Sequence, residues 1–267
     1  MSEILDRFVR RWDLIPDGEP LLTKSSHLLP VLYGGQRAML KVALTPEEQR
    51  GNRWMVWAAT TATAPVLAQA GDALLMLRAE GSRDLAHMAR SGRDDEATRI
   101  LCDILARLHD RGTILQKQTT HPLSRWLRPL NAISPRHGPV VAAAAVAAAD
   151  LLAQERTTFS LHGDIHHGNV LDFGRDGWRA IDPKALSGDR TYDYANIFCN
   201  PDTATATARF DDRIAMVATV ANIDTERLLQ WILAWSGLSA YWQIESEQDA
   251  RGPLAIGALA IARLDRQ

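Results

Sequence analysis

The stretch from Phe159 to Pro183 constrains this chain most, because it places histidines, carboxylates and an asparagine between short apolar runs. Two segments in it, Val170–Phe173 and Trp178–Ile181, have the length and composition of short strands. The turn between them contains Gly174 and Gly177, and glycine permits a tight reversal of the chain. The pattern therefore predicts two paired strands with polar side chains gathered at neighbouring ends.

The polar residues of this stretch follow a recognisable spacing. His162, Asp164 and Asn169 fit H-x-D-x-x-x-x-N, the spacing of a kinase catalytic loop, although Gly163 stands where protein kinases carry Arg. Asp182 follows thirteen residues after Asn169. Phosphoryl transfer needs a carboxylate to accept the proton of the attacking hydroxyl, and oxygen ligands for Mg²⁺. We interpret Asp164 as the base and Asn169 and Asp182 as metal ligands. The ordinary alternative is that a single Asp or Asn in a turn satisfies only backbone groups.

Two further histidines, His166 and His167, suggest a different chemistry, because H-G-D-I-H-H-G-N contains pieces like those of two-metal phosphoesterases. Such sites collect several His ligands from distant parts of the chain. All eight histidines of this sequence lie at or before His167, so none follows to complete the metal shell. We interpret His166 and His167 as loop-packing or substrate-side residues.

Length and composition favour a globular protein of one or two domains, with 267 residues, 46% of them hydrophobic. A net charge of −2 gives no overall attraction to nucleic acid or to an anionic membrane. Cys102 and Cys199 are too few and too far apart for a disulfide framework. Since we find no signal peptide and no apolar run long enough to span a bilayer, we expect a cytoplasmic protein. The oligomeric state stays open.

Residues 1–78 are expected to form the smaller, strand-rich lobe of an α+β fold. Gly34 and Gly35 supply a hairpin turn, and the strands expected here are Leu21–Ser25, His27–Tyr33 and Ala38–Ala43. Lys41 lies alone among apolar neighbours in the last of these strands. A buried ammonium requires an anionic partner, as in kinases, where this lysine holds the nucleotide phosphates. A lysine on an edge strand facing water is the ordinary alternative.

Glu48 is a candidate partner for Lys41. Thr45 and Pro46 have the arrangement of a helix start, with Thr45 as the N-cap and Glu48 three residues later. Glu48 therefore either fixes Lys41 or closes a capping box with Thr45, and the spacing supports both.

Residues 79–267 are expected to form a larger, mainly helical lobe. The strand Ala73–Leu77 leads into Arg78–Gly81, a segment that either offers its backbone to adenine or is an ordinary loop. Apolar periodicity predicts helices at Asp95–Asp110, Val140–Gln154, Asp224–Ile244 and Pro253–Leu264. Asp193, near the start of another helix, either hydrogen-bonds the catalytic loop or favours the helix dipole. Glu245, Glu247 and Asp249 either face a cleft or form a solvated acidic surface.

These motifs resemble those of the aminoglycoside phosphotransferases, in L-H-G-D-I-H-H-G-N-V, I-D-P, Y-D-Y-A-N-I-F-C-N-P-D and R-L-L-Q-W-I-L-A-W-S-G-L-S-A. More narrowly, the chain is similar to the streptomycin 6-phosphotransferases of the aminoglycoside and hydroxyurea resistance kinase group. That similarity extends to S-S-H-L-L-P-V and M-L-K-V-A near the N-terminus. The catalytic-loop motif specifies only the reaction class, whereas the flanking stretches carry the narrower assignment.

The resemblance implies a two-lobed protein-kinase-like fold that binds ATP and Mg²⁺ between its lobes and phosphorylates the 6-hydroxyl of streptomycin. Lys41 would hold the phosphates with Glu48 as its partner, and a hinge containing Arg78 and Glu80 would bind the nucleotide. Two departures stand out. No G-x-G-x-x-G precedes Lys41, which leaves Ser25–His27 to cover the phosphates, and Asp182-Pro183-Lys184 replaces D-F-G.

Streptomycin carries two guanidinium groups, so its site should present carboxylates. The candidates are Asp193, Asp202, Glu245, Glu247 and Asp249. Three hypotheses follow: an antibiotic kinase, a kinase of another small hydroxyl compound such as choline or an amino sugar, and a nucleotide-binding scaffold without catalysis.

Overall fold

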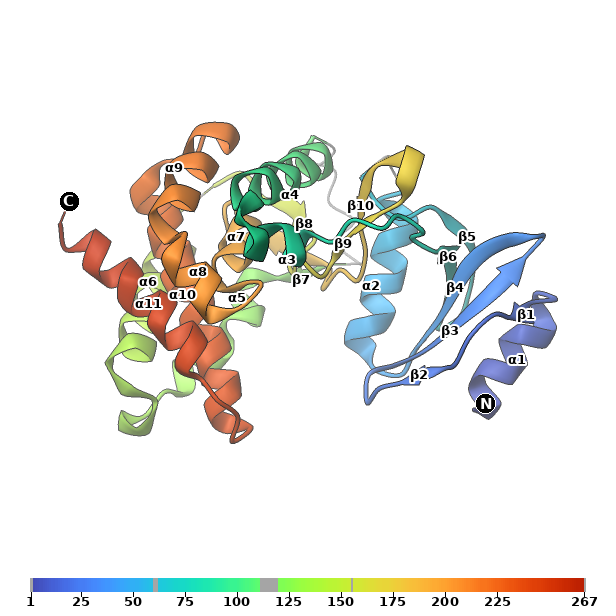
Figure 1. The fold of residues 1–267 in the computed structure, drawn as a ribbon. Helices are drawn as coiled ribbons and strands as arrows, with labels where there is room; N and C mark the ends of the chain where they lie inside the picture. Colours follow the sequence, from blue (N-terminus) through green and yellow to red (C-terminus); the bar gives the residue numbers. More distant parts are fainter. Residues whose placement is uncertain (1, 60–61, 111–119, 155, 267) are drawn as a thin grey trace.

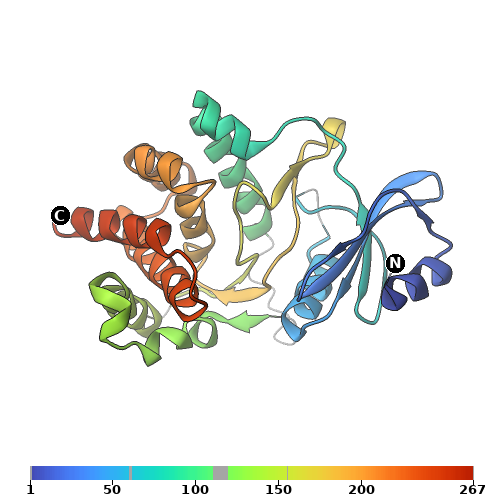
Figure 2. The same ribbon diagram turned by 60° about the horizontal axis from the view of Figure 1, so that its bottom comes forward.

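The computed structural model of the chain describes residues 2–59, 62–110, 120–154 and 156–266. It has two lobes, an antiparallel sheet with two helices at the N-terminal end and a mainly helical body at the C-terminal end (Figures 1 and 2). This confirms the predicted α+β class with a small strand-rich lobe followed by a larger helical one. The predicted boundary after residue 78 falls directly behind the last strand of the sheet, which ends at Leu77, and stays a prediction.

The N-terminal sheet has the order β1-β3-β4-β6-β5, with β2 paired to β3. Gly34 and Gly35 form the predicted turn between β3 and β4, both with positive φ. The strands are β1 (Ile15–Pro16), β2 (Leu21–Leu22), β3 (Ser26–Tyr33), β4 (Gln36–Ala43), β5 (Val66–Ala70) and β6 (Ala73–Leu77). The predicted strand Leu21–Ser25 is therefore shorter, because Thr23 Oγ1 accepts from the Ser25 and Ser26 amides and turns the chain.

Alternation along the strands divides the sheet into two apolar faces. Leu40, Val42 and Leu75 pack with α1 (Glu3–Arg11) on the outer face. The intervening residues, Leu74 and Met76 among them, join the core of the helical lobe through α2 (Pro46–Trp57). Figure 1 shows α2 on the side of the sheet nearer the helical lobe and α1 on the opposite side. Lys41, one residue from Leu40 and Val42, consequently projects toward the other lobe.

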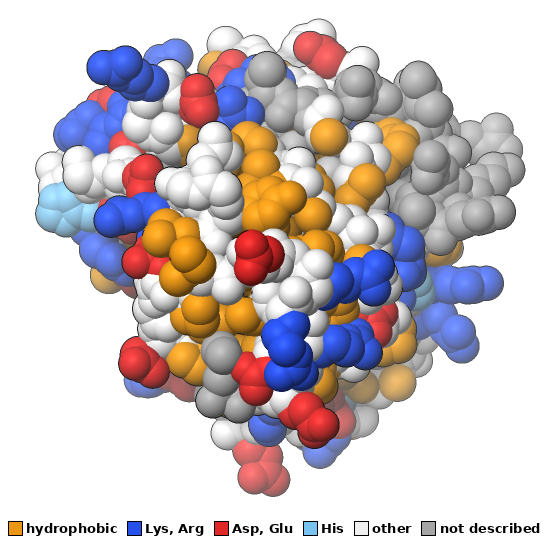
Figure 3. Space-filling model, turned by 90° about the vertical axis from the view of Figure 1, so that its right-hand side faces the viewer, with side chains coloured by type: hydrophobic (Ala, Val, Ile, Leu, Met, Phe, Trp, Pro, Cys, Tyr) orange, Lys and Arg blue, Asp and Glu red, His pale blue; other side chains and the backbone are white. Residues whose placement is uncertain are grey.

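The outer end of the sheet lobe has solvent-exposed apolar side chains on its surface (Figure 3). They lie together among Lys, Arg, Asp and Glu side chains. Ile15, Leu21 and Leu22 of the first two strands are each more than half exposed.

The segment after β6 is tied to the helical lobe through Asp172. The Gly81 amide donates to the Asp172 carbonyl at 2.9 Å, and Arg83 binds both carboxylate oxygens of Asp172. A Cβ at Gly81 would lie 2.0 Å from Asp172 Cγ, so only glycine fits this approach. The connection between lobes therefore has a defined attachment at β9 (Val170–Asp172).

The helical lobe is built around α10 (Thr225–Glu245), which packs against α6 and α11. The other helices include α3 (Leu85–Met88), α4 (Asp94–His109), α5 (Leu123–Trp126), α6 (Gly138–Ala153), α7 (Tyr192–Ala195), α8 (Thr203–Ala208), α9 (Phe210–Ala221) and α11 (Arg251–Leu264). The four helices predicted in this lobe are confirmed to within a few residues at each end. The sequence interpretation missed α8 and α9. In α8 the Thr- and Ala-rich sequence has weak apolar periodicity.

Two small sheets frame the polar stretch. β9 pairs antiparallel with β10 (Trp178–Ala180), as predicted. A second sheet has the order β7 (His121–Pro122), β11 (Leu186–Gly188), β8 (Phe159–Leu161). Among the described residues, no helix is long and apolar enough to cross a membrane.

Candidate active site

The loop between β8 and β9 is held by buried hydrogen bonds of His162. The His162 ring donates from Nε2 to the Ile181 carbonyl at 2.9 Å, and its own carbonyl accepts from the Lys184 amide at 2.7 Å. Burial lowers the pKa of His162, so the ring is neutral near pH 7. Gly163 has a φ of 84°, and a Cβ there would lie 2.6 Å from Leu186 Cγ, which explains why no larger residue occupies this position.

Asp193 anchors the same loop from α7. One carboxylate oxygen accepts from the Gly163 amide at 2.7 Å, and the other from the His162 amide at 3.1 Å and from His109 Nε2 at 2.9 Å. Of the two predicted roles for Asp193, the structure shows the hydrogen bond to the loop. The substrate role predicted for Asp193 does not agree with the structure, because its side chain is fully enclosed.

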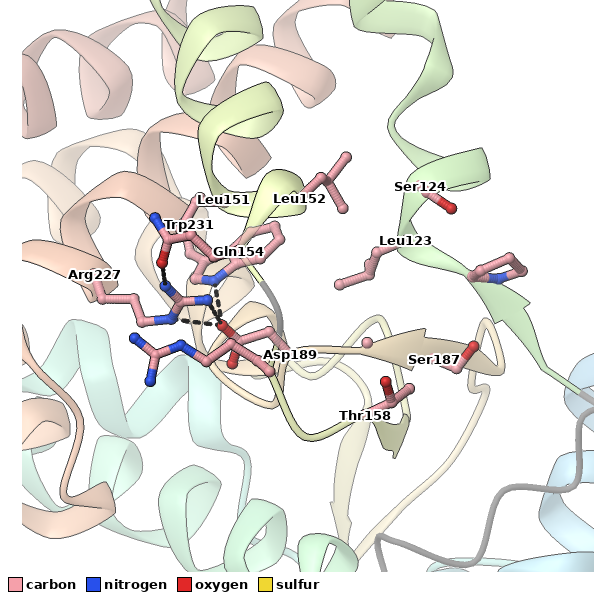
Figure 4. Close-up of a pocket in the computed structure, with 13 residues that line it drawn as sticks. Leu123, Ser124, Leu151, Leu152, Gln154, Thr158, Ser187, Asp189, Arg227 and Trp231 are labelled. Atoms are coloured by element: carbon pink, nitrogen blue, oxygen red, sulfur yellow. Dashed lines mark hydrogen bonds and ion pairs between the residues drawn. The ribbon is translucent and has the colours of Figure 1, made fainter.

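The segment that carries Asp193 is fixed in turn at Asp189. Figure 4 shows Arg227 and Trp231 of α10 converging on the Asp189 carboxylate, at one side of a cavity of about 220 Å³. The Trp231 indole donates at 2.9 Å. Asp189 also accepts from the Thr191 amide at 2.9 Å. The loop between β8 and β9 is thus held by Asp193, and the segment that carries Asp193 is held to α10 by Asp189.

Asp164 and Asn169 lie side by side at the tip of the loop. The Asn169 amide nitrogen donates to the Asp164 carbonyl at 2.9 Å and to its carboxylate at 3.3 Å, which leaves the Asn169 carbonyl oxygen free of that contact. Asn196 Nδ2 donates to the other Asp164 oxygen at 2.7 Å and orients the carboxylate. Asn196 was missed in the sequence, although it stands in the Y-D-Y-A-N motif after Asp193.

Lys41 joins the two lobes at this point. Its side chain is 6% exposed and pairs with Glu48 at 2.5 Å and with Asp182 of the catalytic stretch. The Glu48 carboxylate also accepts from Ser26 Oγ at 3.1 Å. Although burial favours the neutral acid, the Lys41 ammonium holds the pKa of Asp182 below its ordinary value. Both interpretations of Glu48 were partly correct, since its amide is capped by Thr45 while its carboxylate turns to Lys41.

Lys184 and Glu47 form a second ion pair beside the first, which sequence reasoning did not assign. Lys184 Nζ lies 3.3 Å from Glu47 Oε1 and 3.6 Å from Glu48 Oε1. Burial alone would lower the pKa of Lys184, but four surrounding carboxylates raise it above its ordinary value, those of Asp164, Asp182, Glu47 and Glu48. Lys184 therefore stays charged at any physiological pH.

A cavity of about 310 Å³ opens directly beside Asp164. Its walls come from both lobes and are largely aromatic, and they consist of Glu47, Trp126, Gly163, Asp164, Lys184, Tyr192, Trp235 and Trp242. Trp126 meets Trp242 edge to face at 5.3 Å between ring centroids, and donates from Nε1 to the Tyr192 hydroxyl at 2.8 Å. We call this cavity the acceptor pocket, because it adjoins the carboxylate interpreted as the base.

The other acids predicted to face substrate do not line the acceptor pocket. Asp202 caps α8 by accepting from the Thr205 amide at 2.9 Å, and it also pairs with Arg90. Glu245 pairs with Arg136 and with His137 at 3.0 Å. Glu247 and Asp249 are exposed beyond the end of α10. The carboxylates that do line the pocket are Asp164 and Glu47.

The predicted hinge residues lie at a separate, wider cavity of about 580 Å³, which Phe173 also lines. Arg78 forms an ion pair with Asp17, and Glu80 forms one with Arg37 at 3.1 Å. Because these side chains are occupied, a nucleotide base here would meet the backbone of the segment, as the sequence interpretation expects.

The two loop histidines differ in their surroundings. His166 accepts from the Gly168 amide at 3.0 Å, and its Nε2 lies 4.0 Å from the Asp164 carboxylate. His167 is 1% exposed, and burial lowers its pKa to about 3. Across the described ranges, no group of three or more His, Cys, Asp and Glu could hold a metal ion. Of the residues expected to cover the phosphates, Ser26 donates to Glu48, and His27 bonds Ser2 Oγ at 3.0 Å.

Solved structures with the same fold include aminoglycoside phosphotransferase APH(4)-Ia in a ternary complex with ADP and hygromycin B. It aligns with a TM-score of 0.63 and 16% identity, covering 99% of this chain and 97% of that one. The amicoumacin kinase hAmiN in complex with AMP-PNP, Ca²⁺ and Ami aligns with a TM-score of 0.67 and 12% identity, covering 100% and 94%. The two-lobed kinase-like fold is thereby confirmed.

Sequence relatives are more specific. The chain is 47% identical to a streptomycin 3''-kinase of Klebsiella pneumoniae over 96% of its own length and all of that protein. It is 28% identical to a streptomycin 6-kinase of Streptomyces glaucescens, over 96% of this chain and 87% of that one. The model of the aminoglycoside/hydroxyurea antibiotic resistance kinases matches residues 11–247. This protein belongs to the aminoglycoside/hydroxyurea antibiotic resistance kinase family.

Proposed function

We propose that this protein transfers the γ-phosphoryl group of ATP to a hydroxyl of streptomycin. The observation that carries the proposal is that Asp164 lines the acceptor pocket together with Lys184, whose ammonium is influenced by the carboxylates of both Asp164 and Asp182, the ion-pair partner of Lys41. Phosphorylation adds about −1.5 to −2 charges to the drug, which weakens its attraction to anionic RNA. Antibiotic resistance is the corresponding biological role.

The hydroxyl we propose is at the 3'' position. The 47% identity to a streptomycin 3''-kinase exceeds the 28% identity to the 6-kinases, over similar shares of this chain. The 6-hydroxyl expected from the sequence motifs is the second candidate, since those motifs belong to the shared family.

In the proposed mechanism, Asp164 orients the acceptor hydroxyl and takes its proton as the oxygen attacks the γ-phosphorus. The bond from that phosphorus to the β-γ bridging oxygen breaks, and ADP leaves. Asn196 holds the Asp164 carboxylate in place through its 2.7 Å hydrogen bond. Lys41 supplies a fixed positive charge for the nucleotide phosphates, as its buried position between Glu48 and Asp182 allows.

The residues around Asp164 also fit a Mg²⁺ ion. The Asn169 side-chain nitrogen donates to Asp164, which leaves the side-chain carbonyl oxygen available to a metal ion. Asp182 is 38% exposed, and its pKa lies below the ordinary value. Both offer the hard oxygen atoms that Mg²⁺ prefers. When bound there, the ion would neutralise phosphate charge during transfer.

The test is an ADP-release assay with ATP and Mg²⁺ across a panel of aminoglycosides and small hydroxyl compounds, with mass and NMR assignment of the product. We expect streptomycin phosphate carrying the new group at the 3'' position. The Asp164→Asn variant should lose about 10² to 10⁴-fold in kcat, the usual contribution of a general base. Unchanged turnover in that variant would remove Asp164 from the assigned role.

A kinase of another small cationic hydroxyl compound, such as choline or an amino sugar, is the alternative that the aromatic wall of the acceptor pocket favours. Turnover of such an acceptor in the panel, with none of streptomycin, would support it. ATP binding without ADP release on any acceptor would support a scaffold without catalysis.

A further inference from the structure

Lys184 and Glu47 come from different lobes and meet at the wall of the acceptor pocket. Glu47 lies in the first turn of α2 in the sheet lobe, whereas Lys184 follows Asp182 in the helical lobe. Their charged atoms are 3.3 Å apart, and their side chains are 22% exposed for Lys184 and 38% for Glu47. Both line the acceptor pocket beside Asp164. The pair therefore stands where the acceptor and the phosphoryl group have to meet.

Glu47 and its neighbour Glu48 differ in how firmly they are held. Glu48 is 8% exposed and is bound by Lys41 and Ser26, and its Oε1 also lies 3.6 Å from Lys184 Nζ. Glu47 has Lys184 as its ion-pair partner and faces the acceptor pocket with more than a third of its side chain exposed. Of the two carboxylates, Glu47 is thus the one free to change partner when a cationic ligand enters.

Lys184 is the cation of this pair, and its side chain is 22% exposed. Its ammonium lies near the carboxylates of Asp164 and Asp182, the residues assigned to the base and to a metal ligand. Lys41 is already enclosed by Glu48 and Asp182. If Lys184 lost Glu47, its flexible side chain would reach toward the phosphoryl group, for which a lysine is a suitable point charge.

We propose that the Glu47–Lys184 ion pair is exchanged when the acceptor binds. A guanidinium group of the acceptor replaces Lys184 as the ion-pair partner of Glu47 and packs against Trp126 and Trp242. Lys184 then turns to the oxygens of the γ-phosphoryl group. This inference rests on the proposed function, because it requires an acceptor with a guanidinium group. Carboxylates bind guanidinium through two parallel hydrogen bonds, and aromatic faces attract the same cation.

The exchange couples acceptor binding to catalysis without adding a proton transfer. Asp164 still takes the hydroxyl proton while the new P–O bond forms and the bond to the ADP oxygen breaks. Lys184 remains an ammonium throughout and stabilises the charge on the transferring group. In the absence of a guanidinium acceptor, Glu47 retains Lys184, which disfavours transfer to water.

The test compares Glu47→Gln, Lys184→Met and Lys184→Arg in the full-length protein, with Asp211→Asn as the control, since Asp211 forms an exposed ion pair with Arg263 away from the cleft. Steady-state kinetics with ATP and streptomycin give kcat and KM, and calorimetry with ADP and Mg²⁺ gives the Kd of streptomycin. Circular dichroism checks that each variant is folded.

The exchange predicts opposite signatures for the two residues. Glu47→Gln should raise the KM for streptomycin about 10- to 100-fold, the value of a hydrogen-bonded charge, and should affect the KM for ATP much less. Lys184→Met should lower kcat about 10² to 10³-fold while binding streptomycin at least as tightly as the wild type, because Glu47 is then unpaired. Lys184→Arg should recover part of kcat.

Three results would overturn the inference. An unchanged KM for streptomycin in Glu47→Gln would show that Glu47 does not bind the guanidinium group of the acceptor. Weaker streptomycin binding in Lys184→Met makes the pair a fixed link between lobes. If the wild-type enzyme does not phosphorylate streptomycin, both the proposed function and the exchange are overturned. The first two results, obtained with a wild type that does phosphorylate streptomycin, overturn the exchange alone.

Discussion

The two sides of Asp164 are built on different principles. On the side proposed to bind the phosphates, which we call the phosphate side, Lys41, Glu48 and Asp182 form a compact set of charges, with side chains 6%, 8% and 38% exposed. On the acceptor side, tryptophans from α5 and α10 surround a pocket, and Glu47 faces it from the other lobe. Lys41 and Glu48 are thus enclosed on the first side, whereas the Lys184–Glu47 pair of the second side is more exposed and stands beside aromatic rings.

This difference fits what each side would have to recognise under the proposed function. The polyphosphate of ATP has one shape and a high charge, so a prearranged cluster of charges suits it. An acceptor presents rings, hydroxyls and cations, which aromatic walls and one exchangeable carboxylate accommodate. We therefore expect substitutions on the phosphate side to affect folding and every reaction of the enzyme. Substitutions on the acceptor side should change selectivity with a smaller cost in stability.

The largest effect is expected for Lys41→Met on the phosphate side. Removing the ammonium leaves Glu48 and Asp182 as neighbouring carboxylates in a desolvated site, which costs about 3–5 kcal/mol of folding free energy. Urea denaturation measures this loss, and titration with ADP and Mg²⁺ should show that nucleotide binding is lost as well. The exposed Lys24 is a matched control, since Lys24→Met should stay within about 0.5 kcal/mol of the wild type. Equal losses in both variants would contradict the enclosed character of the phosphate side.

Asp193→Asn should produce the next largest effect, through the loop that carries Asp164. An amide cannot accept from the two backbone N–H groups of His162 and Gly163 and from His109 as well, and a buried unsatisfied group costs about 1–3 kcal/mol. We expect a lower urea midpoint together with a lower kcat.

The control for Asp193→Asn is Asp224→Asn, because Asp224 is an exposed N-cap of α10 and asparagine caps a helix equally well. A lower midpoint with unchanged kcat in Asp193→Asn would show that the loop keeps its geometry without this anchor.

On the acceptor side, Trp242→Ala should raise the KM for a cationic acceptor by about 2- to 30-fold, the range of a cation–π contact. The KM for ATP should stay near its wild-type value, because Trp242 lines the acceptor pocket and Lys41 does not. Trp242→Phe, which keeps an aromatic face, should restore part of the affinity. An equal rise in both KM values would mean that the two sides are not separate in the way described above.

The same contrast explains what the sequence predicted. Asp164, Asn169 and Asp182 occur within one continuous stretch with a fixed spacing, so the reaction class could be predicted locally. Lys41 was found because a charge stands out in an apolar strand. The pairing of Glu48 with Lys41 needed the structure, because spacing allowed a capping box equally well.

The acceptor pocket could not be predicted in this way. Its walls come from α2, α5, α7, α10, the loop after β8 and the segment after Asp182, which meet only in the folded chain. Asp193, Asp202, Glu245, Glu247 and Asp249 were predicted to face the substrate instead, and in the structure Asp202 and Glu245 are paired with arginines. Glu47 was passed over because an acid in a first helical turn has an ordinary explanation in the helix dipole.

The smallest effect is expected at Asp172, which ties the inter-lobe segment to β9. Hydrogen bonds from Arg83, which outweigh the opposing effect of burial, lower the pKa of Asp172 to about 2. A carboxyl group with a lower pKa in the folded protein stabilises it fully above its ordinary pKa near 4, and this contribution is lost as the pH falls from about 4 to about 2. Because Arg83 is half exposed, we expect a contribution of about 1 kcal/mol or less. The gap in urea midpoint between wild type and Asp172→Asn should therefore narrow between pH 5 and pH 2.5. Asp176→Asn, on the exposed turn of the same hairpin, should show little difference at either pH. If the difference in urea midpoint between wild type and Asp172→Asn stayed constant with pH, Asp172 would act through packing against Gly81. The link between the lobes would then not depend on the charge of Asp172.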